Sequence, residues 1–363
     1  MIILKKGILL TLIPIIIVVT ATVGIIFVLK NSQDLPEEPP INKETQPEEV
    51  EEPDNIREIV ISFVGDCTLG QDNKFGYHGR FNYYFDRVAK GDYSYFFGGV
   101  IDVLANDDYT VANLEGTLTT SNDIWEKSFN FKGYPSYVNI LKQGSVEAVN
   151  IANNHIFDFR EAGMKETINT LKAAGIDYFG YEDVLVKNIG DINVGFFGLS
   201  AWGHKPARKR DIENAINKLK ELEAEVIIFN FHAGIEGSNY PDRIQQEMSR
   251  YAIDLGADLV IGHHVHVLQG IEYYKGKYIV YSLANFVFGG NSNPIDKDTM
   301  ILQAKINIEN DVKSIDLNII PASVSGVTHR NDFRPRILEG KDADRVIRRI
   351  NEYSKNLNFQ YSR

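Results

Sequence analysis

The chain has 363 residues, 44% of them hydrophobic, which is enough for one large domain or two small ones with a sizeable core. Its formal net charge of −11 and the lack of a dense Lys/Arg cluster exclude a general nucleic-acid binder, because neutralising phosphates requires a basic face. The single cysteine, Cys67, excludes an internal disulfide framework and a thiolate zinc cluster, so a bound metal must use histidine and side-chain oxygen.

An uncharged segment rich in Ile, Leu and Val extends from Gly7 to Leu29, and its 23 residues suffice to cross the hydrocarbon layer as a helix. The segment is longer than the apolar region of a cleaved signal peptide, and no clear cleavage site follows it. We therefore predict an uncleaved single-pass anchor over residues 1–30. Because Lys5 and Lys6 precede the segment and basic flanks stay cytoplasmic, the C-terminal domain is expected on the extracytoplasmic side of the cell membrane.

Residues 31–57 are rich in Pro and Glu and nearly free of large apolar side chains. Such a composition cannot offset the entropy lost on ordering, so we predict a disordered acidic linker that extends by self-repulsion. An acidic arm that binds a partner is the alternative.

From residue 58 onward, apolar runs that end in Gly, Asp, Asn or His alternate with segments whose apolar residues recur at helical spacing. The runs predicted as buried strands are 58–66, 109–116, 146–155, 194–200, 225–234 and 257–266. The predicted helices are 135–144, 159–175, 211–225 and 241–256. This alternation predicts a layered α/β fold for one domain, residues 58–363.

The last part of the chain has a different pattern. Residues 273–288 and 300–324 alternate like antiparallel strands, with turns expected at Lys275-Gly276 and Asn310-Asp311. A final amphipathic helix, about residues 342–356, is expected to pack on the outside.

Five predicted strands end in residues that can bind a metal or form hydrogen bonds. These residues are Asp66, then Asn113 and Glu115, then Asn154 and His155, then His232, and finally His264 and His266. Alone, an Asp after a strand is commonly a turn or cap residue, and a lone His is commonly structural. If the strands lie side by side, however, their ends converge on one rim, where α/β sheets place their ligand sites.

The mixture of side chains at these strand ends suits a transition metal. Asp66 and Glu115 supply carboxylate oxygens, Asn154 an amide oxygen, and the three histidines 232, 264 and 266 supply nitrogens. Such a set fits one or two divalent ions of manganese, zinc or iron. Two ions about 4 Å apart could activate a water molecule and clamp a phosphoryl group.

The ordered set VGD, NLEG, NNH, FHAG and GHHVHVLQG, found between residues 58 and 288, resembles the CapA family of poly-γ-glutamate capsule synthesis proteins. That family is related to the calcineurin-like metallophosphoesterases. The resemblance implies a four-layer α/β/β/α sandwich with a metal site at the strand ends. By position it implies His155 as an acid or substrate contact, and as metal ligands Asp66, Glu115, Asn154, His232, His264 and His266.

The sequence also departs from the phosphoesterase pattern. Thr68 stands where related enzymes have the histidine of an Asp-x-His motif, so one metal position lacks a ligand. Asn113 and Glu115 replace a Gly-Asp pair, and Ala284 replaces the glycine of an SLGNF pattern. These departures leave open whether the site can hold two metals.

Several neighbouring residues have two interpretations each. Asp158 could orient His155 as a catalytic partner or cap the helix that begins near residue 160. Asn285 could face the site as a substrate contact or serve a structural turn, and Asn113 is a further candidate for substrate binding. Glu236 could contact metal or substrate or be solvated, and Lys132 could meet an anionic substrate.

The leading prediction is a membrane-anchored, extracytoplasmic, metal-dependent phosphoesterase-like protein in poly-γ-glutamate capsule synthesis or export. Its expected partners are the membrane, capsule synthetase or export subunits, and an anionic polymer or phosphoester substrate. One alternative is a non-catalytic metal-binding scaffold subunit, which the missing Asp-x-His histidine favours. Another is an extracellular hydrolase that cuts the amide bonds of polyglutamate.

Overall fold

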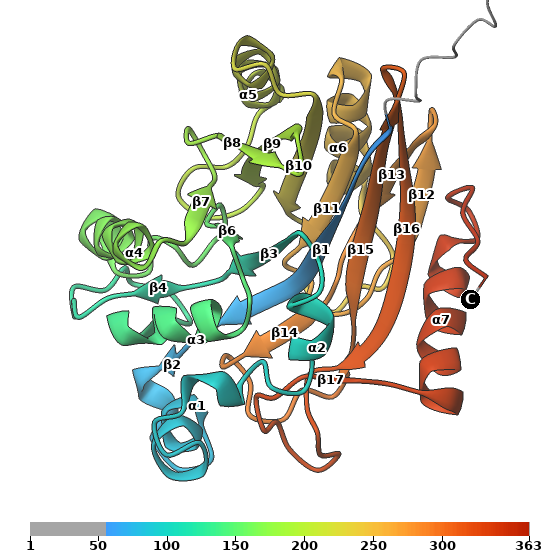
Figure 1. Ribbon diagram of the computed structural model, residues 1–363. Helices are drawn as coiled ribbons and strands as arrows, with labels where there is room; N and C mark the ends of the chain where they lie inside the picture. The colour runs from blue at the N-terminus through green and yellow to red at the C-terminus, as the bar shows by residue number, and fades with distance from the viewer. Residues whose placement is uncertain (1–55, 363) are drawn as a thin grey trace, which may run out of the picture. The chain divides into compact units, whose positions relative to one another are not determined.

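A computed structural model describes residues 56–362, which contain two large β-sheets and their covering helices (Figure 1). The predicted anchor, residues 1–30, and almost all of the predicted linker, residues 31–57, lie outside the described residues. Within residues 56–362, none of the helices combines the length and apolar character that a bilayer span requires.

The first sheet has eight strands, in the order β17-β16-β15-β1-β3-β6-β7, with β14 also paired to β1. Strands β1, β3, β6 and β7 are parallel, whereas β15, β16 and β17 are antiparallel additions. The bounds are β1 Ile56–Thr68, β3 Tyr109–Leu114, β6 Ala148–Asn150, β7 Asp177–Phe179, β14 Asn285–Phe288, β15 Asp298–Glu309, β16 Val312–Ser323 and β17 Arg336–Ile337.

The second sheet has six strands in the order β12-β13-β11-β10-β9-β8. Strands β9, β10, β11 and β13 are parallel, and the edge strands β8 and β12 are antiparallel to their neighbours. The bounds are β8 Leu185–Ile189, β9 Ile192–Ser200, β10 Val226–His232, β11 Leu259–His263, β12 Ile271–Tyr274 and β13 Lys277–Val280. A small third sheet joins β2 (Gln71–Asp72), β5 (Phe131–Gly133) and β4 (Thr117–Leu118).

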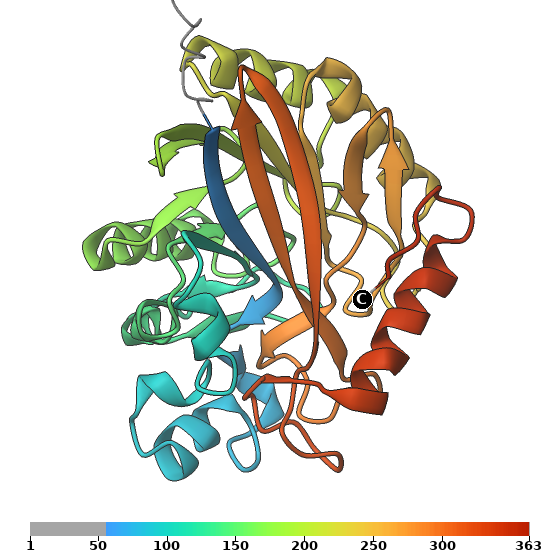
Figure 2. The same cartoon turned by 45° about the vertical axis from the view of Figure 1, so that its right-hand side comes forward.

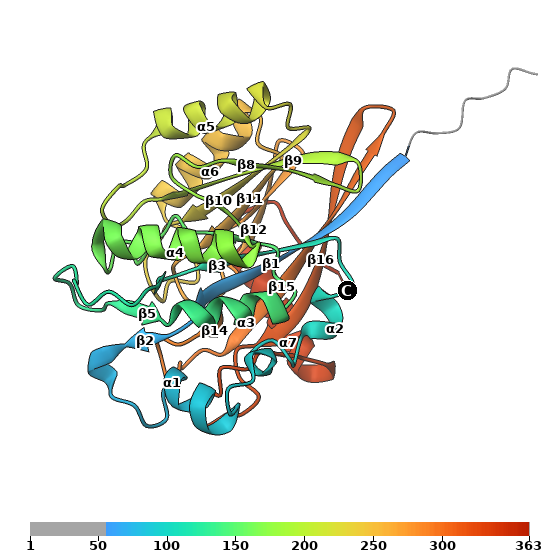
Figure 3. The same cartoon turned by 60° about the vertical axis from the view of Figure 1, so that its left-hand side comes forward.

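The helices cover the outer faces of the two sheets, as a turned view makes clear (Figure 3). Helices α3 (Val138–Gln143) and α4 (Arg160–Ala174) pack on the first sheet, and α5 (Lys209–Glu221) and α6 (Arg243–Leu255) pack on the second. Helix α7 (Gly340–Ser354) contacts β12 and β16, beside the edges of both sheets (Figure 2). Two short helices, α1 (Phe81–Tyr83) and α2 (Ile101–Leu104), also contribute to the core on the helix-covered face of the first sheet.

The apolar core between the sheets explains why so many strands are continuously hydrophobic. Along β1, Ile61 and Phe63 point into the layer between the sheets, whereas Val64 points toward the helices on the other face. A parallel strand buried on both faces needs apolar residues at nearly every position. The predicted layered α/β fold is therefore confirmed.

Local signals also located the turns. Both predicted hairpin turns are present, and their central residues have positive φ: 49° and 80° at Lys275-Gly276, and 48° and 66° at Asn310-Asp311. This is the conformation that short hairpin turns require. The predicted final helix is α7, which begins at Gly340 and ends at Ser354.

One segment departs from the expected pairing. Residues 273–288 do not form a simple antiparallel pair: β12 and β13 belong to the second sheet, but β14 crosses to the first sheet and pairs parallel to β1. The crossing passes very close to Gly65, where a Cβ would lie 2.0 Å from the carbonyl oxygen of Ala284. Only glycine leaves room for this approach.

Candidate metal centre

The polar strand ends lie together, but they come from two facing sheets rather than one rim. Strand β1 carries Asp66, and Glu115 directly follows the end of β3. From the second sheet, β10 ends at His232 and β11 leads into His264. The backbone N–H of His264 donates a 3.3 Å hydrogen bond to Asp66 Oδ2, so the two sheets meet at the site itself.

Two overlapping groups of potential ligands share Glu115. In the nitrogen-rich group, ligand atoms of Glu115, His232 and His264 lie within 4.8 Å of one another. In the oxygen-rich group, the same holds for Asp66, Glu115 and His266. Asn154 adjoins the first group, with its Oδ1 2.7 Å from His232 Nε2.

The environment of Glu115 indicates that these residues fit a cation. The side chain is fully buried, and neither carboxylate oxygen has a hydrogen-bond partner among the described residues. Leaving a buried carboxylate unpaired is costly, and coordination of a metal would remove that cost. The buried His, Asp and Glu groups are therefore compatible with a metal site.

The negative charges of Asp66 and Glu115 and the positive charge of His266 stabilise one another. Burial, together with the nearby charge of Asp66, raises the pKa of Glu115 well above its usual value. Burial also opposes ionisation of Asp66, but hydrogen bonds from His266 and Asn113 outweigh it and lower its pKa. For His266, burial is outweighed by the two carboxylates, which raise its pKa to about 9. A proton on His266 thus supplies positive charge between the carboxylates.

The other two histidines are held neutral. Burial lowers the pKa of His264 to about 3 and that of His232 well below its usual value. A neutral imidazole has a free lone pair, which is the form that binds a metal.

The backbone at the site adopts unusual conformations. His264 and His266 have φ of 97° and 63°, and Ala284 has φ of 65°. Each such residue costs about 1–3 kcal/mol and persists only where the surrounding structure imposes it. The positions of the two histidines are thus fixed by the fold rather than by local preference.

Beside the metal groups, His155 forms a hydrogen-bonded cluster with Asp158 and Lys127. His155 Nδ1 is 2.7 Å from Asp158 Oδ2, and its Nε2 faces Glu115 Oε1 at 3.9 Å. Lys127 Nζ donates to Asp158 Oδ1 at 2.6 Å and to the carbonyl oxygen of Asn154 at 2.8 Å. Asp158 therefore orients His155, and it does not cap α4, whose first flanking residue is Phe159.

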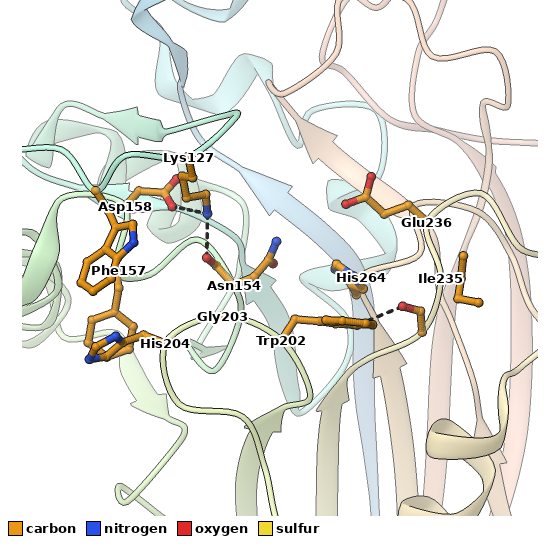
Figure 4. A pocket seen from close by; sticks show the side chains of 12 residues that line it. Lys127, Asn154, Phe157, Asp158, Trp202, Gly203, His204, Ile235, Glu236 and His264 are labelled. Atoms are coloured by element: carbon orange, nitrogen blue, oxygen red, sulfur yellow. Dashed lines mark hydrogen bonds and ion pairs between the residues drawn. The ribbon is translucent and has the colours of Figure 1, made fainter.

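A cavity of about 770 Å³ opens beside this cluster (Figure 4). Lys127 and Asp158 lie on one side of it, and Glu236 and His264 lie on the other. Aromatic side chains, among them Trp202, supply much of its wall. The cavity thus combines a cation and an apolar wall next to the groups that could hold metal.

Three of the four predicted substrate-binding residues do not line this cavity. Lys132 Nζ instead donates to the carbonyl oxygen of Ser121 at 2.6 Å and to Asn122 Oδ1 at 2.8 Å. Asn113 lies behind the ligands and donates to Asp66 Oδ1 at 2.8 Å, and Asn285 contacts His266. Lys132 and Asn113 therefore do not face this cavity, whereas Glu236 does.

Sequence reasoning missed Lys127 and the aromatic wall. Lys127 lies in a loop with no periodic pattern. No pattern of strands or helices favours it as a site residue over Lys132, five residues later. Its position depends on Asp158, which is distant in sequence. A lysine within a run of aromatic residues, from Trp125 to Phe131, was the only available signal.

The fold and the site together define a layered α/β protein with a buried group of carboxylates and histidines suited to divalent cations. The family model "Bacterial capsule synthesis protein PGA_cap" matches residues 60–290, and the chain belongs to this family, the CapA family of capsule synthesis proteins. The resemblance inferred from the motifs is thereby confirmed.

Two curated relatives carry the same assignment. The chain is 28% identical over 318 residues to the capsule biosynthesis protein CapA of Bacillus anthracis, covering 80% of this chain and 72% of that protein. It is 30% identical over 253 residues to the PGA biosynthesis protein CapA of Bacillus subtilis (strain 168), covering 63% of each chain, slightly less than two thirds. A solved structure described as a novel phosphatase from Mycoplasma pneumoniae matches at TM-score 0.44 and 14% identity, over 76% of this chain and 95% of that one.

Proposed function

We propose that this protein is a metal-dependent, phosphoesterase-like hydrolase that acts in the synthesis or export of a poly-γ-glutamate capsule. Family membership supports the pathway, and the site supports the type of reaction. The observation that carries the proposal is the pair of ligand groups that share Glu115 and adjoin a cavity containing Lys127. We also propose that the chain has the fold of the calcineurin-like metallophosphoesterases.

Each part of the site has a role in this proposal. Divalent ions held by the two ligand groups would supply Lewis-acid activation of water and of a phosphoryl group. Lys127 would attract the anionic substrate into the cavity. His155 presents Nε2 toward Glu115, with Nδ1 held by Asp158, which suits it to transfer a proton to the leaving oxygen. Burial lowers the pKa of His155, and the hydrogen bond to the Asp158 carboxylate offsets only part of that effect.

The proposal includes a location. Residues 1–30 would anchor the protein in the cell membrane and leave residues 58–363 outside the cytoplasm, where a surface polymer is handled. The support is the uncharged segment from Gly7 to Leu29 and its basic N-terminal flank. Protease treatment of intact cells tests this: an extracytoplasmic domain is degraded, and a cytoplasmic one is protected.

The reaction is tested with the full-length purified protein. Metal content is measured together with hydrolysis of a panel of phosphomonoesters and phosphodiesters, for wild type, Glu115→Gln and His264→Ala. His329→Ala is the matched control, because His329 is exposed and belongs to neither ligand group. We expect both site variants to lose hydrolysis and the control to retain it.

The absence of the Asp-x-His histidine, with Thr68 in its place, favours one competing function, a metal-binding scaffold subunit. Bound metal without turnover of any phosphoester would support the scaffold and contradict the proposal. Shortening of added polyglutamate, with phosphoesters untouched, would instead support an amide hydrolase.

A further inference from the structure

The oxygen-rich group is one ligand short. It contains Asp66, Glu115 and His266, whereas the residue two positions after Asp66 is Thr68. A metal held by only three side chains depends on water or substrate for the rest of its coordination. A further protein ligand would have to come from another part of the chain.

Strand β14 brings Asn285 directly beside Asp66. The two residues are partners in the parallel β1–β14 pairing, and the backbone N–H of Asp66 donates to the carbonyl oxygen of Ala284 at 3.0 Å. Gly65 permits this close approach, because any Cβ there would collide with the Ala284 carbonyl. The crossing of the chain between sheets thus places an amide next to the carboxylate.

Three side-chain oxygens converge on a single nitrogen, His266 Nδ1. Asn285 Oδ1 is 2.9 Å from it, Asp66 Oδ2 is 3.2 Å from it, and Glu115 Oε2 is 3.9 Å from it. Asn285 Nδ2 donates to the carbonyl oxygen of His266 at 3.2 Å, which turns the amide so that Oδ1 faces the group. Asp66, Glu115 and Asn285 are almost fully buried. Water therefore cannot easily replace their three oxygens.

We propose that Asn285 Oδ1 is the fourth protein ligand of an oxygen-rich divalent cation position formed with Asp66, Glu115 and His266. This inference rests on the proposed function. Asn285 thereby takes the place of the histidine that Thr68 replaces, although it comes from a strand more than 200 residues further along the chain.

The two cation positions then differ in chemistry. The position with Asn285 offers two carboxylates, one amide oxygen and one imidazole, which suits manganese or magnesium. The position with Glu115, His232, His264 and the adjoining Asn154 is richer in nitrogen, which suits zinc or iron. The protein is therefore expected to bind a mixed pair of ions rather than two of one kind.

Thr68 is the competing candidate for the missing ligand. Its Oγ1 is buried and has no hydrogen-bond partner among the described residues, and its side chain is on the same face of β1 as that of Asp66. However, Asn285 Oδ1 lies 2.9 Å from His266 Nδ1, whereas Thr68 Oγ1 has no hydrogen-bond partner in the group. Thr68→Val therefore serves as the matched control.

The test uses full-length protein stripped of metal and reloaded with Mn²⁺ and Zn²⁺ together. Metal per chain is measured by mass spectrometry, and Mn²⁺ affinity by electron paramagnetic resonance. Wild type and Thr68→Val are expected to bind one ion of each metal. Asn285→Ala should bind Mn²⁺ about 10- to 100-fold more weakly and keep its Zn²⁺, whereas Asn285→Asp should keep both.

Two results would overturn the inference: unchanged Mn²⁺ affinity in Asn285→Ala, or loss of Mn²⁺ in Thr68→Val instead. A circular dichroism melt identifies variants that fail to fold, and Asn285→Leu, which keeps the volume of the side chain but lacks the amide oxygen, then replaces Asn285→Ala and should show the same weakening of Mn²⁺ binding. Failure of the proposed function looks different. In that case Mn²⁺ is lost on Asn285→Ala, but the wild type hydrolyses no phosphoester.

Discussion

His155 and Asp158 are three residues apart in the chain, and their side chains meet at 2.7 Å, from Nδ1 to Oδ2, in a buried setting. Asp158 Oδ2 also accepts a hydrogen bond from the backbone N–H of Phe131 at 2.6 Å. The carboxylate therefore has a fixed position, and it fixes the direction of the His155 ring in turn.

The first prediction concerns this pair. Asp158→Asn is expected to lower kcat about 10- to 100-fold, because the His155 ring loses the partner that sets its orientation. KM should rise less than kcat falls, because Asp158 orients His155 directly, whereas it acts on substrate binding only through Lys127. Steady-state kinetics checks this, with the exposed Asp123→Asn as control. Equal changes in kcat and KM would argue against an orienting role.

Lys127 carries the second prediction. Lys127→Met should raise KM for an anionic substrate about 10- to 100-fold, because a hydrogen bond to a charged group contributes about 1.5–3 kcal/mol. Lys132→Met should leave KM unchanged, since Lys132 bonds to Ser121 and Asn122 outside the cavity. The prediction fails if Lys132→Met has the larger effect.

The third prediction concerns stability in the absence of metal. Because the pKa of Glu115 is raised well above its usual value in the folded protein, the folded state binds more protons than the unfolded state once the pH exceeds the unfolded pKa, about 4, and stability falls as pH rises from there toward the folded pKa. Glu115→Gln removes that penalty. Its melting temperature should exceed that of wild type in chelator at pH 7 and fall below it when Mn²⁺ and Zn²⁺ are present. The same order of stability in both buffers would exclude a metal ligand at residue 115.

The fourth prediction is an acid-sensitive ion pair far from the site. Burial opposes ionisation of Asp296, but hydrogen bonds from Arg349 on α7 outweigh it, so the pKa of Asp296 is lowered. A lowered carboxyl pKa stabilises the fold above the unfolded value, about 4, and that stability is lost as pH falls further. Arg349→Met should therefore cost about 1.5–3 kcal/mol at pH 7 and less at pH 3, measured by urea unfolding. A cost independent of pH would contradict this.

The fifth prediction tests the close approach at Gly65. Gly65→Ala would force its Cβ against the Ala284 carbonyl oxygen, so β14 must move away from β1 and take Asn285 with it. We expect a large loss of stability together with weakened Mn²⁺ binding. Gly237→Ala is the control, because a Cβ at Gly237 would meet no other atom and only the φ of 77° is unfavourable. This variant should lower the free energy of unfolding by only about 1–2 kcal/mol and leave metal binding intact.

The strands were predictable where burial dictates composition. Strand β10 is apolar at every position before His232 except Asn230, because both of its faces are covered, by the facing sheet and by helices. Pairing was not predictable in the same way. Strand β14 has the pattern of a hairpin strand, yet it joins the other sheet, because the choice between two neighbouring sheets depends on contacts distant in sequence.

In the candidate site, too, some positions could be predicted from the sequence and others could not. Asp66 lies near the end of β1 and His264 directly follows β11, so their positions could be inferred from the strand pattern alone. The roles of Lys127 and Asn285 could not, since each depends on a partner that only the folded chain supplies: Asp158 for the lysine and His266 for the amide. The periodicity of apolar residues shows where a strand ends, but it does not show which loop lies over that end.

Because Asp66 comes from one sheet and His264 from the other, neither half of the sandwich can form this centre by itself. An ion bound there would link the two sheets at the strand ends, in addition to the apolar core that joins them elsewhere. Metal uptake during maturation would then be the last step of assembly, and a chain with its halves misaligned would be left without a cation.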